Sequence, residues 1–71
     1  MMEYFLLIIH GDVDPEIIGT FIDRDSRDEA AYKYRKVNDP EGNDGIFALE
    51  THFGKKPSVS SYSAAFFEEE R

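Results

Sequence analysis

The residues best suited to chemistry follow a short apolar run near the N-terminus. Residues 4–9 are apolar, and four polar groups come directly after them: His10, Asp12, Asp14 and Glu16. Imidazole nitrogens and carboxylate oxygens together bind Zn²⁺, Mn²⁺ or Fe²⁺. His52 would join them if the two strands that precede these histidines ran parallel. One hypothesis is therefore a metal- or ligand-binding protein that uses His10, Asp12 and His52.

The same segment also fits an ordinary loop, and this interpretation is favoured. Residues 11–16 contain Asp14 followed by Pro15, the residue types preferred at the first two positions of a type I turn. The spacing of the histidines and carboxylates matches no recognised metal-ligand motif. We therefore expect no metal and no cofactor.

Two further polar segments lack the pattern that a site requires. Residues 39–45 are acidic, but they have neither the glycine position nor the flanking helices of a calcium-binding loop. Four serines cluster near the C-terminus without the flanking glycines of a catalytic serine: Ser58, Ser60, Ser61 and Ser63. We expect no catalytic residues, and we predict that the protein is not an enzyme.

Tyr32 is a candidate contact residue on the predicted helix. A helical wheel places it away from the apolar face, close to basic side chains, and such a tyrosine is typical of an interface anchor. The alternative is that its ring packs on the aliphatic stem of Lys36. The local basic residues complement the helix dipole or solvate a turn, although they are also suited to an acidic partner: Lys33, Arg35, Lys36, Lys55 and Lys56.

Composition and charge narrow the function classes. The 71 residues include 8 Lys and Arg against 15 Asp and Glu, a net charge of −7 that repels nucleic-acid phosphates. The apolar run over residues 4–9 is too short for a signal peptide or a membrane span, so we expect a cytoplasmic protein without a membrane partner. The absence of cysteine excludes disulfides, so association with a second subunit is the expected supplement to a small core.

Four strands and one main helix are predicted from periodicity and turn signals. The strands cover residues 4–9, 17–22, 46–53 and 58–63, with a bulge at Gly19. Ser26 and Glu29 match a capping box, which predicts that the helix begins at Ser26. Its apolar face contains Ala30, Ala31, Tyr34 and Val37, and residues 38–45 end it.

These elements predict a single α+β domain over residues 1–71, in the order β-β-α-β-β. The sheet is mostly antiparallel with the helix on one face, and residues 63–71 form a short C-terminal helix or a loosely ordered tail. Because the first strand is apolar on both faces, one helix leaves one face uncovered. We assign Leu6 and Ile8 or their neighbours to that face, with Phe66 and Phe67 of the tail as the alternative cover.

The expected function is accordingly a non-enzymatic protein-protein interaction module that acts as a homo-oligomer, most simply a homodimer, or as an adaptor. The interface candidates are Leu6, Ile8, Tyr32, Phe66 and Phe67.

Overall fold

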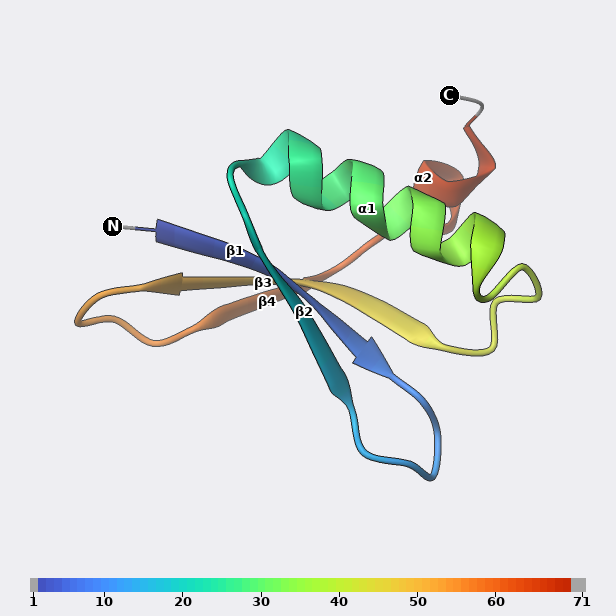
Figure 1. The fold of residues 1–71 in the computed structure, drawn as a ribbon, viewed down its shortest axis with the longest axis horizontal. Helices are drawn as coiled ribbons and strands as arrows, with labels where there is room; N and C mark the ends of the chain where they lie inside the picture. The colour runs from blue at the N-terminus through green and yellow to red at the C-terminus, as the bar shows by residue number, and fades with distance from the viewer. Residues whose placement is uncertain (1, 70–71) are drawn as a thin grey trace.

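The chain folds as four strands and two helices in this computed structural model, which describes residues 2–69 (Figure 1). The elements are β1 (Met2–Ile9), β2 (Glu16–Phe21), α1 (Arg24–Val37), β3 (Gly45–His52), β4 (Ser58–Ser61) and α2 (Ala64–Glu68). The strand order is β2-β1-β3-β4, and all neighbours are antiparallel. The predicted α+β fold, its β-β-α-β-β order and its short C-terminal helix are confirmed.

The apolar strand β1 lies in the middle of the sheet, as its sequence predicts. It pairs with β3 along its whole length and with β2 on the other side, so that Leu6 lies opposite both Ile18 and Ala48. The β1–β2 register shifts next to the pairing of Phe5 with Gly19, which confirms the irregularity expected at this glycine. β4 is a short edge strand, and it ends at Ser61 rather than at residue 63.

Helix α1 begins earlier than the capping-box signal predicts. Its N-cap is Asp23, whose extended backbone places the carboxylate 2.8 Å from the Ser26 amide nitrogen that donates to it. Ser26 is therefore a helical residue whose N–H is capped, and its assignment as the N-cap is wrong. Aspartate is as good an N-cap residue as serine. The helix therefore begins after Asp23, which precedes Ser26 in the chain.

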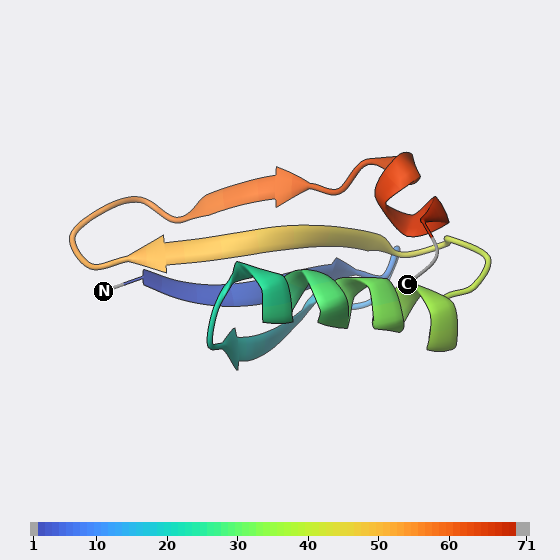
Figure 2. The same ribbon diagram turned by 90° about the horizontal axis from the view of Figure 1, so that it is seen from above.

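The core lies between α1 and one face of the sheet. Its buried apolar residues come from three elements: Leu6 and Ile8 of β1, Ala31 of α1, and Ile46 and Ala48 of β3. Figure 2 shows α1 lying over the sheet and running roughly along the strands, with its last turn near one end of the sheet. Val37 in that turn is 72% exposed, so its predicted place in the buried helix face is wrong.

The C-terminal helix α2 lies on the same side of the sheet as α1 (Figure 1). The Ser63 hydroxyl caps it by accepting from the Phe66 amide at 3.2 Å. The rings of Phe66 and Phe67 pack on Tyr62, with centroid distances of 4.7 and 5.7 Å. The tail therefore extends the helical layer and does not cover the opposite face. Residues 70 and 71 of the predicted tail lie outside the described residues.

Candidate interaction surface

The face of the sheet opposite α1 is apolar and lacks a covering element within residues 2–69. Strand alternation and the observed pairing place seven apolar side chains there: Phe5, Leu7, Ile9, Ile17, Phe47, Leu49 and Val59. We call these seven residues the open face. Both helices lie on the other side of the sheet, as Figure 1 shows.

Two aromatic rings on this face each cover a glycine. A Cβ atom at Gly19 would lie 2.8 Å from the Phe5 ring, and one at Gly45 would lie 2.9 Å from the Phe47 ring. Rings that cover strand glycines in this way shield the backbone.

The open face is partly accessible and almost free of charge. Ile17 is 62% exposed and Val59 is 53% exposed, whereas the four residues at its centre, Phe5, Leu7, Phe47 and Leu49, are half-buried by one another. Among the described strand residues on this side, Glu3 at one end of β1 is the single charged group. A contiguous apolar patch on a small domain marks an interaction site more often than chance.

Two of the interface candidates from the sequence lie in the core instead. Leu6 and Ile8 are 1% and 0% exposed beneath α1, so their assignment to the uncovered face is corrected to their neighbours Phe5, Leu7 and Ile9. Because β1 is apolar on both faces, its sequence does not show which face the helix covers. The helix covers the less apolar face of β3, because that face contains Glu50, whose carboxylate pairs with α1.

Arg27 is the polar centre of the contact between α1 and the sheet, and sequence analysis missed it. This buried guanidinium donates to Glu50 at 3.0 Å and to Asp28 at 3.1 Å. Asp28 also accepts from the Tyr62 hydroxyl at 2.7 Å, while Arg24 forms a bidentate pair with Glu50. A helix that begins at Arg24 places Arg27 four residues before Ala31 on the buried face, which is the signal that would have found it.

These contacts change the acid–base behaviour of the groups involved. Hydrogen bonds from Arg27 and then from Arg24 hold the pKa of the Glu50 carboxyl below its ordinary value. Burial, followed by the hydrogen bond to Asp28, raises the pKa of Tyr62 above the usual tyrosine range. The network holds α1 in its place on the sheet.

His10 lies between two carboxylates at the end of β1. Its Nδ1 lies 3.2 Å from Asp44 Oδ2, and its Nε2 lies 3.2 Å from Glu16 Oε1. The Tyr34 hydroxyl donates to the same Asp44 oxygen at 3.1 Å, and burial together with this bond raises the pKa of Tyr34 to about 12. Both ring nitrogens are paired, so a metal or a substrate proton would have to displace a carboxylate from His10.

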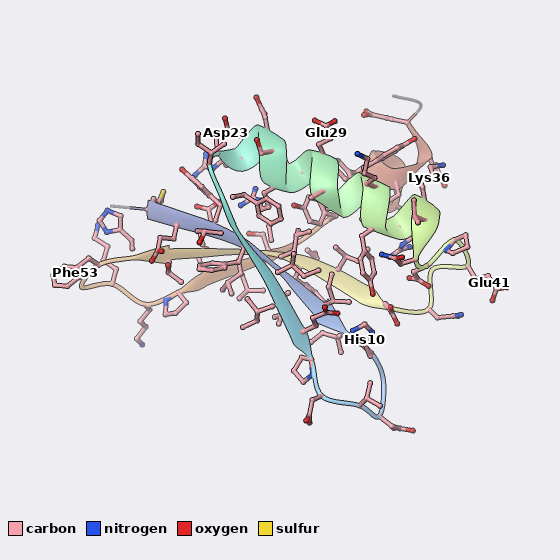
Figure 3. The ribbon with its side chains drawn as sticks, viewed as in Figure 1. His10, Asp23, Glu29, Lys36, Glu41 and Phe53 are labelled. Atoms are coloured by element: carbon pink, nitrogen blue, oxygen red, sulfur yellow. The ribbon has the colours of Figure 1, made fainter. Side chains whose placement is uncertain are left out.

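The hypothetical site of His10, Asp12 and His52 does not form. It required parallel strands, but β1 and β3 are antiparallel, and His52 lies opposite Met2 at the far end of β1. Figure 3 shows His10 and Phe53, the neighbour of His52, at opposite ends of the sheet. Asp12 and Asp14 are exposed in the loop after His10. Within residues 2–69, no three His, Cys, Asp or Glu side chains are arranged so that they could hold one metal ion.

Tyr32 lies close to Lys36 and the C-terminal segment. The Lys36 ammonium is 5.3 Å from its ring centroid, Phe66 meets the ring edge-on at 6.4 Å, and its hydroxyl donates to the Glu69 carbonyl. These contacts favour the packing interpretation over the anchor interpretation.

The remaining candidates have structural partners or exposed positions. Arg35 donates to the Asp44 carbonyl at 3.1 Å and lies over the Phe67 ring at 4.5 Å, so it joins the helix end to the following loop and to α2. Asp39, buried in that loop, accepts from the backbone amides of Asn43 and Asp44, which explains the acidic loop without calcium. The serines of β4 are exposed. Lys33, Lys55 and Lys56 are also exposed.

Comparison with protein-family models, with curated proteins and with solved structures finds no match to this chain. Neither helix within residues 2–69 has the length and apolar character needed to cross a membrane.

Proposed function

We propose that this protein is a non-enzymatic protein-protein interaction module that docks through the open face of its sheet. The observation that supports the proposal is the placement of both helices on one side, which leaves seven apolar residues of all four strands on the other. The function is therefore binding, either between copies of the chain or as an adaptor for another protein.

Energetics support a partner on this face. Burying a large apolar side chain contributes roughly 1.5–3 kcal/mol, and even half of that over the central residues Phe5, Leu7, Phe47 and Leu49 is large for a domain of this size. A core of this size supplies only about 3–5 kcal/mol by itself. A bound partner adds to the stability by mass action, since it binds the folded chain only.

Affinity capture with matched variants tests this function. Leu7 lies at the centre of the open face, whereas Ser60 is exposed on the opposite side of the sheet, where it pairs with Ala48. The wild-type chain, Leu7→Lys and Ser60→Lys are used as baits in lysate from the native cell. Captured proteins are then purified and titrated against each bait, with chemical shifts of the open face as the readout.

The expected result is a purified binder, or the chain itself, that contacts the open face and is lost with Leu7→Lys but kept with Ser60→Lys. The proposal is contradicted if every binder is retained by Leu7→Lys, or if nothing binds and the chain does not associate with itself.

A further inference from the structure

We infer that the occupant of the open face is a second copy of this chain, packed face to face about a two-fold axis. The inference rests on the proposed function and names its partner. Three properties of the open face support it: its lack of charge, its width and the twist of the sheet.

The distribution of charge favours self-association through the open face and through no other part of the described surface. The chain has a net charge of −7, so two copies repel each other over most of their surface. The open face contains no charged residue, and Glu3 lies at its end, beyond Phe5. Two identical uncharged patches can therefore meet without burying like charges. A strongly acidic or basic partner would find no complementary charge on this surface.

The width of the open face favours a second sheet over a single helix as its partner. Four strands spaced by about 4.8 Å make a face roughly 14–19 Å wide, whereas a helix with its side chains is about 10–12 Å across. A docked helix would therefore leave Ile17 of β2 or Val59 of β4, which lie on opposite edge strands, outside the contact. A second four-stranded sheet spans both edges.

The two sheets have the same twist, which suits them to pack face to face. Sheets that pack face to face keep their strands within about 30° of each other because both have the same hand of twist. In each copy a Cβ atom at Gly19 would lie 2.8 Å from the Phe5 ring and one at Gly45 would lie 2.9 Å from the Phe47 ring, so both rings cover a glycine of their own sheet. We place the two-fold axis between the cross-strand pairs Phe5–Leu49 and Leu7–Phe47, midway along the two central strands.

The area of the open face indicates how tightly the two copies bind. The strands contain eight, six, eight and four residues, which gives roughly 400 Å² of flat sheet per copy at about 3.3 Å per residue and 4.8 Å per strand. Two copies together remove roughly 800 Å² of flat surface, and side-chain relief increases this value. This area is below the roughly 1,200–2,000 Å² buried in stable specific interfaces, so we expect a weak dimer with a dissociation constant between about 1 μM and about 1 mM.

Sedimentation equilibrium of the full chain, from about 1 μM to about 1 mM, tests the inference. The wild-type protein should pass from monomer to a mass twice that of the chain. Leu7→Lys should raise the dissociation constant by about 100-fold or more, because it buries an unpaired ammonium in the contact. Ser60→Lys makes the same charge change on the other side of the sheet, and it should leave the dissociation constant within about twofold.

A second variant covers the case in which Leu7→Lys fails to fold. Val59 is 53% exposed in the single chain, so Val59→Lys should keep the fold, checked by circular dichroism, and still weaken the dimer. A wild-type chain that stays monomeric to about 1 mM overturns the inference, as does a dimer that survives both open-face variants or weakens equally with Ser60→Lys. A monomeric chain whose open face binds a different protein overturns the dimer alone and leaves the proposed function standing.

Discussion

Removing the Glu50 carboxylate should clearly destabilise the contact between α1 and the sheet. Glu50 accepts from the buried Arg27 guanidinium at 3.0 Å, and the Arg27 side chain is 7% exposed. In Glu50→Gln the Arg27 charge stays buried with Asp28 as its remaining carboxylate. Breaking a buried pair costs about 3–5 kcal/mol, and the retained Asp28 contact reduces the expected loss to roughly 2–3 kcal/mol.

Urea denaturation followed by circular dichroism measures this loss, and two variants control it. Arg24 is 61% exposed and shares the same carboxylate, so Arg24→Ala should cost clearly less than Glu50→Gln. Arg27→Met removes the buried charge itself, so the double variant with Glu50→Gln should lose less than the two single losses added together.

The stabilisation by the Glu50 carboxylate should also decrease as the pH is lowered. Because the pKa of Glu50 is lowered in the folded chain, its contribution is present above the ordinary carboxyl pKa and is lost as the pH falls through the folded value. A Glu50→Gln loss below about 0.5 kcal/mol, or one equal to that of Arg24→Ala, would refute the role given to the buried pair.

Three further predictions follow from other contacts. Asp23→Ala should lower the urea midpoint more than Ser26→Ala does, because Asp23 supplies the cap; the reverse order would restore the capping box. Stability should fall between about pH 10 and pH 12, because Tyr34 and Tyr62 both ionise first in the unfolded chain. Tyr34→Phe should make this part of the profile less steep, and an unchanged slope would contradict the raised pKa of Tyr34. Micromolar Zn²⁺ or Mn²⁺ should leave the melting temperature unchanged, because both nitrogens of His10 are paired; a saturable rise that His10→Ala abolishes would contradict this.

The sequence predicted the features that depend on neighbours along the chain. The apolar run before His10, the alternation around Phe47 and the turn residues after Val37 identified the strands, the helix and their order. These signals are local, because side-chain period and turn chemistry act over a few residues. Gly19 is another example, since a strand glycine indicates an irregularity wherever it pairs.

The features that the sequence did not predict depend on contacts between distant residues. The side of the sheet that α1 covers is set by Arg27 with Glu50, which are 23 positions apart. The partner of His10 is Asp44, 34 positions away. Neither pairing has a local signal, so the sequence could show that one face of β1 is uncovered but not that it contains Phe5 and Leu7 rather than Leu6 and Ile8.

Isotope-filtered nuclear Overhauser spectroscopy shows directly whether two copies of this chain meet through the open face. A sample mixes ¹³C-labelled and unlabelled chains at a concentration above the dissociation constant. We expect intermolecular contacts from the Phe5 and Phe47 rings to the methyl groups of Leu7 and Leu49. Intermolecular contacts that involve α1 or α2 and omit these four residues, or a spectrum without any at millimolar concentration, would contradict it.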